Sequence, residues 1–303
     1  MLYRSKLLGY KLTASIHTVE IYSNQMPVLD GINENTVKVV CKLNKNTGEF
    51  VSRIFINPHN YYSNNNREIL EYSLFEKVMT ELTERMELHE WQYSRIDVRL
   101  DSYENNYQEY FKLNALFIDL FTMAYIFKNG EATESMGHRS RSKCGVYIKN
   151  QNMSVDYYDK NKESRGKFPC KARLEFRMMK LNGKSPTDVI KVLFRRFENL
   201  DSYYHENIKE CNKSLLRNYK WTKKNRPLKD RNDILTPYIW ENQDVFYNMK
   251  QLECFCKMCG VGNPAVRAKS IARKTCKIEF ISKKNISDYI AIIKNFITQY
   301  MES

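Results

Sequence analysis

The sequence lacks any hydrophobic run long enough to cross a membrane. A membrane-spanning helix needs roughly 18 to 20 consecutive apolar residues, and no stretch of the 303-residue chain approaches that length. The first residues, MLYRSKLLGYKL, also lack the apolar stretch of a secretory signal peptide. We therefore expect a soluble, cytoplasmic protein with no membrane partner.

The sequence also lacks the cysteine spacing of a disulfide framework. Its eight cysteines are scattered through a long chain, which is typical of reduced thiols. The segment CFCKMC raises the question of a zinc site, with Cys254, Cys256, Cys259 and the distant Cys276 as ligands. However, the same segment has helical apolar spacing and ends at a glycine suited to a helix C-cap. We favour cysteines packed in the core over a zinc centre.

Acidic residues are few relative to basic ones. The chain has 49 Lys and Arg residues against 35 Asp and Glu residues, which gives a formal net charge of +14 and makes a polyanion the natural partner. Basic residues concentrate in two runs, 213–231 and 267–284. One such run is ordinarily a solvated helix face, whereas two in one region favour nucleic acid. The residues that we expect to contact it there are Lys220, Lys223, Lys224, Arg226, Arg267, Lys269, Arg273 and Lys274.

The hydrophobic periodicity predicts an α+β fold. We expect strands at 11–22, 36–43, 50–57, 91–101, 132–137, 144–149, 153–160 and 171–181. Helical spacing runs through 64–88 and 106–127, and Ser185 and Pro186 begin another helix as N-cap and first helical residue. The prediction is therefore a mostly antiparallel sheet with helices packed on it over residues 1–183, followed by a mainly helical region over 184–303.

Residues 256–275 have the outline of a helix-turn-helix. A helix is followed by a short turn with Gly and Asn, and then by a second helix that opens at Pro264 and carries basic residues. Any pair of antiparallel helices with a glycine turn has the same pattern, so simple packing is the alternative.

Three of the predicted strands interleave carboxylates and cations on one face, with bulky apolar residues on the other. Alternate residues of a strand share a face. The motif RIDVRLD places Arg95, Asp97, Arg99 and Asp101 together. In KARLEFRM the shared face carries Arg173, Glu175 and Arg177, and in SVDYYDK it carries Asp156, Tyr158 and Lys160.

Two explanations fit these polar faces. One is a solvent-facing sheet with cross-strand ion pairs, each contributing about 0.2 to 1 kcal/mol. The other is an active site, because clustered carboxylates bind Mg²⁺ or Mn²⁺ and a nearby tyrosine can attack a phosphodiester. A phenol has a pKa of about 10, so a cation such as Lys160 is needed to favour the phenolate.

The order of four motifs resembles the replication initiation factor family, which comprises rolling-circle initiators of Gram-positive plasmids and related relaxases of integrative conjugative elements. The motifs are RIDVRLD, SMGHRSRSKCGVYIK, VDYYDKNKE and ARLEFRMMKLNG, within about residues 91–183. The resemblance implies that Asp97, Glu163 and Glu175 bind Mg²⁺ or Mn²⁺, with Asp101 in reserve. It also implies that Tyr158 is the nucleophile, and that the protein acts on origin DNA as a homodimer with a host helicase.

The sequence departs from the family pattern at one position. The family often has a second tyrosine four residues after the first, where this chain has Lys162. If the later tyrosine is the family nucleophile, Tyr157 or Tyr158 must replace it here. Arg139 and Arg141, in the second motif, are expected to contact DNA. The five histidines include no His-x-His pair, so carboxylates would have to supply the metal site.

The leading hypothesis is thus a metal-dependent enzyme that nicks and rejoins one DNA strand through a phosphotyrosine intermediate. The alternative is a sequence-specific DNA-binding initiator or regulator without catalysis. A third hypothesis is an RNA-binding protein that uses exposed tyrosines for stacking. Metal-dependent nicking separates the first from the second, and competition by duplex DNA counts against the third.

Overall fold

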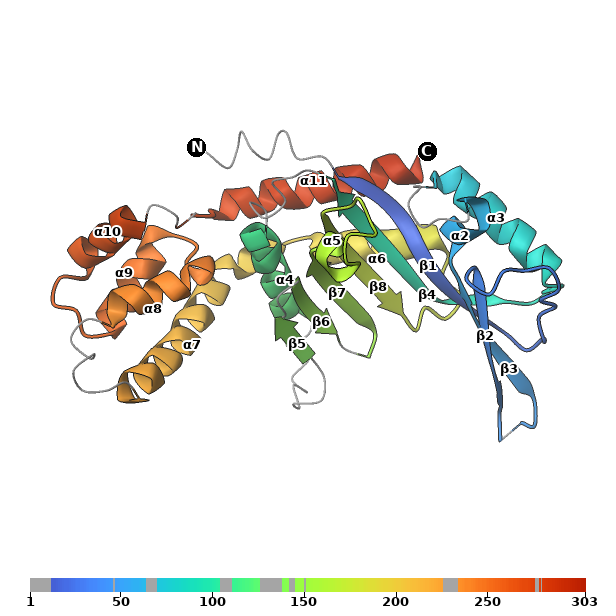
Figure 1. The fold of residues 1–303 in the computed structure, drawn as a ribbon, viewed down its shortest axis with the longest axis horizontal. Helices are drawn as coiled ribbons and strands as arrows, with labels where there is room; N and C mark the ends of the chain where they lie inside the picture. Colours follow the sequence, from blue (N-terminus) through green and yellow to red (C-terminus); the bar gives the residue numbers. More distant parts are fainter. Residues whose placement is uncertain are drawn as a thin grey trace.

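One antiparallel sheet with helices on it forms the larger part of the molecule, so the chain is α+β as predicted (Figure 1). The computed structural model describes residues 12–45, 47–63, 70–103, 111–125, 138–141, 145–149, 151–225, 234–275, 278 and 280–303, with the backbone alone at 63, 138–141 and 275. In this part of the chain the sheet has eight strands in the order β2-β3-β1-β4-β8-β7-β6-β5. The strand predicted at 132–137 lies outside the described residues.

Apart from β5, which the sequence pattern did not predict, the strand bounds follow that pattern closely. They are β1 (Thr13–Ser23), β2 (Val37–Leu43), β3 (Phe50–Ile56), β4 (Gln92–Ser102), β5 (His138–Arg141), β6 (Gly145–Lys149), β7 (Met153–Tyr158) and β8 (Ala172–Met179). Central strand β4 pairs with β1 on one side and β8 on the other. The register of β1 against β4 shifts between Ile16 and Thr18, so His17 occupies a bulge.

The apolar face of the sheet packs against α3 (Tyr72–Arg85), α4 (Phe111–Tyr125), α6 (Pro186–Phe197) and α11 (Lys283–Met301) (Figure 1). Phe117 of α4 shows how these layers meet. Its ring lies 6.1 Å from that of Phe176 on β8, 5.7 Å from that of Phe197 on α6 and 5.8 Å from that of Tyr289 on α11. Truncating such a ring to alanine typically costs about 3 to 5 kcal/mol.

Helix α6 begins where the sequence predicted. The Ser185 hydroxyl accepts a hydrogen bond from the Asp188 amide at 3.2 Å, and Pro186 occupies the first helical position. Two short helices lie elsewhere on the sheet body: α2 (Pro58–Ser63) and α5 (Lys160–Glu163). None of the helices in the described part of the chain combines the length and apolarity needed to span a membrane.

A second unit has its own core at one end of the sheet body (Figure 1). It contains α8 (Leu235–Glu241), α9 (Met249–Met258), α10 (Pro264–Thr275) and the second half of α7 (Tyr204–Asn225). The rings of Tyr219, Tyr238 and Phe255 lie within 5.3 to 6.1 Å of one another in this core. The predicted boundary near Gly183 differs from this division, because α6 and α11 pack on the sheet with the first core.

Candidate functional site

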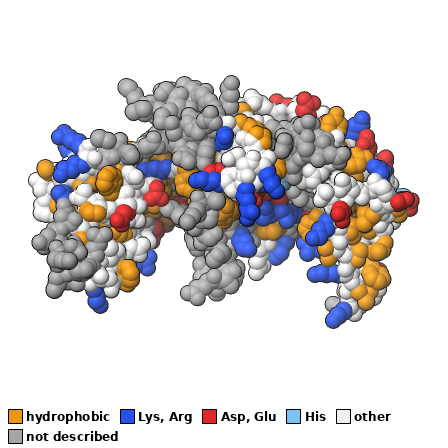
Figure 2. All heavy atoms as spheres, viewed as in Figure 1, with side chains coloured by type: hydrophobic (Ala, Val, Ile, Leu, Met, Phe, Trp, Pro, Cys, Tyr) orange, Lys and Arg blue, Asp and Glu red, His pale blue; other side chains and the backbone are white. Residues whose placement is uncertain are grey.

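The polar residues of β4, β7 and β8 form rows across one face of the sheet. Directly paired residues of antiparallel strands share a face. The first row contains Asp101, Arg173 and Tyr158, the second contains Arg99, Glu175 and Asp156, and the third contains Asp97, Arg177 and Ser154. Figure 2 shows Lys and Arg side chains gathered over this region and over α5. The fold therefore places Asp97, Asp101, Glu175 and Tyr158 on one face, whereas Glu163 lies on α5.

Three of the four carboxylates in these rows, Asp97, Asp101 and Glu175, are bonded to arginine. Arg173 donates two hydrogen bonds to Asp101, at 2.7 and 2.9 Å, and both side chains are buried. Asp97 accepts bonds from Arg95 and, at 3.3 Å, from Arg177. Burial alone would raise the pKa of Asp101, but the Arg173 guanidinium, with a neighbouring arginine, holds it below its ordinary value.

This arrangement does not fit the predicted divalent-metal site as it stands. Asp97 faces two arginines, Glu175 accepts a bond from Arg177 at 3.1 Å, and Glu163 lies on α5, where its half-exposed carboxylate pairs with Lys160 at 2.7 Å. Among the described residues, no group of three or more His, Cys, Asp or Glu side chains is placed to hold a metal ion. A divalent-metal site needs several carboxylate oxygens directed at one point. The carboxylates of Asp97, Glu163 and Glu175 are instead directed at arginine or lysine side chains.

Tyr158 is bonded to a carboxylate. Its hydroxyl donates to Oε2 of Glu175 at 3.1 Å, and its side chain is only 8% exposed. The pKa of Tyr158 is raised above its ordinary value, chiefly by burial and further by the charge of Glu175, while Arg173 acts in the opposite direction. Tyr158 is therefore a neutral phenol next to a base that can accept its proton.

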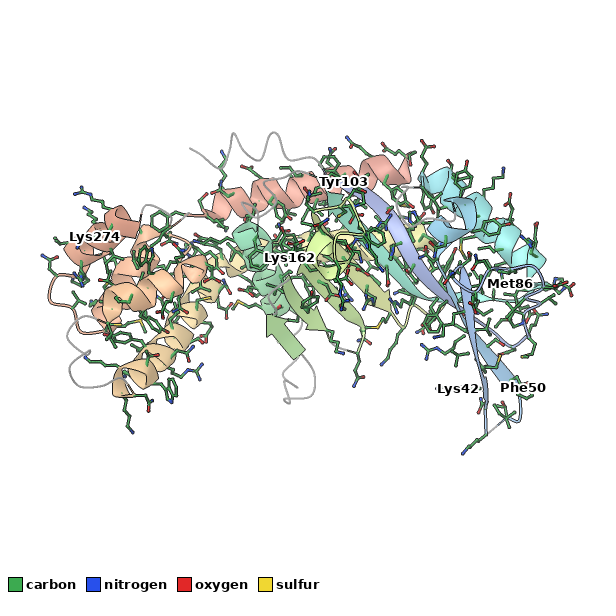
Figure 3. All side chains as sticks on the ribbon, in the orientation of Figure 1. Lys42, Phe50, Met86, Tyr103, Lys162 and Lys274 are labelled. Atoms are coloured by element: carbon green, nitrogen blue, oxygen red, sulfur yellow. The ribbon has the colours of Figure 1, made fainter. Side chains whose placement is uncertain are left out.

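The cationic Lys160 of α5 lies near the Tyr158 ring. Asp159 ends β7 and serves as N-cap of α5, accepting from the Lys162 amide at 2.8 Å. Lys160 is thus helical, although the sequence pattern placed it on the strand. Its ammonium lies 5.8 Å from the ring centre of Tyr158 and 4.8 Å from that of Phe168. In Figure 3 the labelled Lys162 lies over the sheet in the same region.

Gly145 on β6 leaves the space that the Tyr158 side chain occupies. The two residues are paired across the strands, and a Cβ atom at position 145 would lie 2.5 Å from the Cβ of Tyr158. Only glycine allows so close an approach. Tyr157, the other candidate nucleophile, faces the core, where it is 1% exposed and its ring lies 5.5 Å from that of Phe111. Tyr157 is therefore on the wrong side of the sheet to join Tyr158.

A buried arginine and a pair of histidines on this part of the sheet were not singled out from the sequence. Arg99 is 1% exposed, its Nε donates to the Ser15 hydroxyl at 2.7 Å, and its Nη1 has no hydrogen-bond partner among the described residues. The ring centres of His17 and His59 lie 6.0 Å apart. Burial, together with Arg99 and Arg173, holds the pKa of His17 well below its usual range. Hydrophobic periodicity does not reveal β-bulges, so the sequence carried no sign of the bulge at His17.

The predicted DNA-contacting residues of the last third lie in the second unit. Lys220, Lys223 and Lys224 are exposed on α7, and Lys269, Arg273 and Lys274 are exposed on α10, where Figure 3 labels Lys274. Arg267 is half-buried and donates to the Thr236 hydroxyl at 2.9 Å. Arg226 lies outside the described residues, and Arg139 and Arg141 are described in backbone only.

The cysteines of CFCKMC divide between core and surface. Cys256 is buried in the core of the second unit, Cys254 is exposed and Cys259 is half-buried. Burial raises the pKa of the Cys256 thiol to about 11, which favours the neutral thiol over the thiolate that binds zinc. Cys276 lies outside the described residues. The turn after α9 and the following α10 do have the order of a helix-turn-helix.

Comparisons with known proteins give one loose match. No family model matches the chain, and no curated protein matches it. Among solved structures, the chain is similar to a rolling circle replication initiator protein from Geobacillus stearothermophilus, with 12% sequence identity and a TM-score of 0.33, over 60% of this chain and 78% of the other. A likeness this loose defines neither family nor activity, so the functional argument rests on the site.

Proposed function

We propose that this protein nicks one strand of DNA through Tyr158, as a replication initiator or relaxase does. The observation that carries the proposal is the hydrogen bond from the Tyr158 hydroxyl to Glu175 beside the cationic groups of Arg173 and Lys160. A base within hydrogen-bonding reach of a nucleophile is the arrangement that activates it. The +14 net charge suits a polyanionic substrate.

The chemical step can be written with side chains of this face, Lys160 of α5, the substrate and one proton from solvent. Tyr158 Oη forms a bond to the phosphorus of a phosphodiester as Glu175 accepts the phenolic proton. The bond from phosphorus to the sugar oxygen of the leaving strand breaks, and that oxygen takes a proton from solvent. Arg173 and Lys160 are the cations nearest to the developing negative charge. Because Tyr158 is only 8% exposed, neighbouring groups must first move for a phosphodiester to reach its hydroxyl.

The test is a covalent adduct with supercoiled origin DNA, resolved by denaturing electrophoresis with and without Mn²⁺. We expect Tyr158→Phe to abolish the adduct. The matched control is Tyr157→Phe, which removes a hydroxyl from the opposite face and should leave the adduct intact. Loss of the adduct in the Tyr157 variant alone would overturn the assignment. The requirement for Mg²⁺ or Mn²⁺, the homodimer and the host helicase stay predictions.

A second candidate function is origin-specific DNA binding without catalysis. It is favoured by the pairing of Asp97, Asp101 and Glu175 with arginines, which leaves a neutralised, buried network in place of a metal cluster. Under this alternative the protein binds DNA but forms no adduct, and Tyr158→Phe leaves binding unchanged because there is no nicking to lose.

A further inference from the structure

Four adjacent hollows form a groove along the end of the sheet opposite Tyr158. They follow the edge at which β7 and β4 begin and β8 and β1 end. From the β7 end of this edge to the β1 end, the volumes of the four hollows are about 590, 330, 400 and 310 Å³. Each shares lining residues with the next: Arg196 joins the first pair, Asn182 the second and Trp91 the third. The groove lies roughly 17 Å along β7 from Tyr158, at about 3.3 Å per residue.

The cations of this groove differ from those on the sheet face. Lys180, Lys184, Arg195 and Arg196 line its first two hollows. Unlike Arg95, none of these four makes an ion pair within the described part of the chain. The acidic residues that line the groove are Glu198 and Glu90, one near each end. The groove therefore carries uncompensated positive charge, whereas the arginines of the central rows are already neutralised.

Arg196 is half-buried among neutral groups. Its Nη1 lies 2.6 Å from the sulfur of Met153, and its guanidinium carbon lies 5.7 Å from the ring centre of Tyr125. Burial lowers the pKa of Arg196, and no carboxylate opposes the effect. Holding a guanidinium out of water without a counter-ion is costly, and an anion in the groove would relieve that cost. Lys180 itself has a left-handed backbone, with φ at 56°.

Aromatic side chains lie on either side of this run of cations in the groove. Tyr203 lines the first hollow, and Trp91 lines the third and fourth. Both side chains are half-buried. Proteins bind single strands without reading their sequence by combining cations that follow the phosphate backbone with aromatic rings on which the bases stack.

We propose that this groove binds single-stranded nucleic acid, with phosphates against Lys180, Lys184, Arg195 and Arg196 and bases on Trp91 and Tyr203. The identification of the strand as DNA rests on the proposed function, while the binding does not. A strand released near Tyr158 would be held along the edge of the same sheet. A strand and a free nucleotide both present a phosphate beside a planar base, so the test must distinguish these two ligands.

Trp91 provides the readout. The chain has three tryptophans, and Trp221 and Trp240 are exposed in the second unit. In a background of Trp221→Phe and Trp240→Phe, Trp91 fluorescence is titrated with a short oligothymidylate, with ATP and with inorganic phosphate. We expect quenching by the oligonucleotide alone. Equal quenching and similar affinity with ATP would overturn the proposal in favour of a mononucleotide site.

Charge removal provides the matched comparison. Lys184→Ala with Arg195→Ala removes two exposed groove cations, whereas Lys191→Ala with Lys209→Ala removes two exposed lysines from elsewhere on α6 and α7. We expect the groove variant to bind the oligonucleotide at least tenfold more weakly, with a log–log salt slope shallower by about 1.4, and the control to bind normally. Equal binding by both variants would overturn the proposal that this groove binds the strand.

A Tyr158→Phe variant separates this proposal from the proposed function. Strand binding should persist in it whether or not the parent protein forms a DNA adduct. Quenching that survives in Tyr158→Phe supports the groove. Absence of an adduct in the parent protein counts against the enzyme alone, whereas unchanged strand affinity in the groove variant counts against the groove alone.

Discussion

The Tyr158 hydroxyl donates a hydrogen bond of 3.1 Å to Oε2 of Glu175 from the neighbouring strand. The two residues are not paired directly: Tyr158 faces Arg173, and Glu175 faces Asp156. The bond thus runs diagonally across two rows, which is the spacing that long side chains span on a sheet. It joins the candidate nucleophile to a carboxylate placed to take its proton.

Replacing this carboxylate should slow adduct formation without weakening DNA binding. In Glu175→Gln the amide oxygen still accepts the bond but is not a useful base, so we expect the rate to fall by about 10² to 10⁴. Asp156→Asn, which changes the carboxylate bonded to Ser154 at 2.8 Å, is the control and should change the rate far less. Single-turnover measurement of adduct formation checks both variants, and equal rates for the two would remove Glu175 from this role.

Gly145→Ala should disturb Tyr158 directly. The added Cβ falls 2.5 Å from the Cβ of Tyr158, so one of the two strands must shift, at a cost of about 1 to 3 kcal/mol in the free energy of unfolding. Gly262→Ala meets no atom within 4 Å and serves as the control. Urea denaturation gives both values. A stability for Gly145→Ala within about 0.5 kcal/mol of the parent would show that the strands can separate freely there.

The ion pair between Asp101 and Arg173 should matter far more than a surface pair. Asp101→Ala leaves a buried guanidinium without its partner and should cost about 3 to 5 kcal/mol. The comparison is Glu210→Ala, which breaks the exposed pair with Lys213 and should cost about 0 to 1 kcal/mol. Adding Arg173→Met to Asp101→Ala should restore part of the loss. A double variant less stable than Asp101→Ala would contradict the assigned cause.

Stability should fall in mildly acidic solution because of His17. Its folded-state pKa is depressed by burial and by Arg99 and Arg173, so below the unfolded pKa of 6.5 the unfolded chain binds a proton that the folded chain resists. The stability that this histidine contributes is therefore present above pH 6.5 and is lost as the pH falls towards the folded pKa, by up to about 1.4 kcal/mol per pH unit.

The difference between the parent and His17→Gln isolates this contribution, because the other groups titrate in both proteins. The measurement is the free energy of unfolding in urea at several pH values on either side of 6.5. The gap between the two proteins should change in favour of the variant as the pH falls. Parallel curves would mean that His17 is protonated equally well in the folded state.

Two neighbouring basic residues of α10 should behave differently. Lys269 is exposed, so Lys269→Ala should leave stability unchanged and lower the salt slope of duplex binding by about 0.9. Arg267 donates to Thr236 and bridges α10 to α8, so Arg267→Ala should cost about 0.5 to 1.5 kcal/mol of stability. Thermal denaturation and binding at several salt concentrations distinguish them. A stability loss at Lys269 instead would reverse the two roles.

Alternation along β4, β7 and β8 predicted the polar and apolar faces, because a strand repeats every two residues whatever lies beside it. The pattern did not predict which cation meets which carboxylate. That depends on strand register, and the register pairs Arg173 with Asp101 and Arg99 with Glu175. For this reason, the carboxylates that the sequence pattern placed together form a network of ion pairs with arginines.

Other features were out of reach because they depend on contacts distant in the chain. Apolar spacing in α11 indicated a core helix but not that its partner is β1. The proximity of His17 to His59 follows from a bulge and a helix that no local signal connects. Similarly, a boundary placed at Gly183 assumes that consecutive residues share a core, whereas α11 follows the second unit and rejoins the first core.

The return of the chain to the sheet gives the second unit two attachments rather than one. The chain segments that enter and leave it meet at the core of the sheet body: the Ile281 amide donates to the Tyr247 carbonyl at 2.7 Å, the Tyr204 hydroxyl donates to the Ile281 carbonyl, and all three side chains belong to that core. Lys112 of α4 adds a third link, to the carbonyls of Gln243 and Phe246. These links restrict rotation of the second unit against the sheet, so a duplex bound by α10, if the basic residues of that helix contact DNA as predicted, would meet the sheet at a fixed angle.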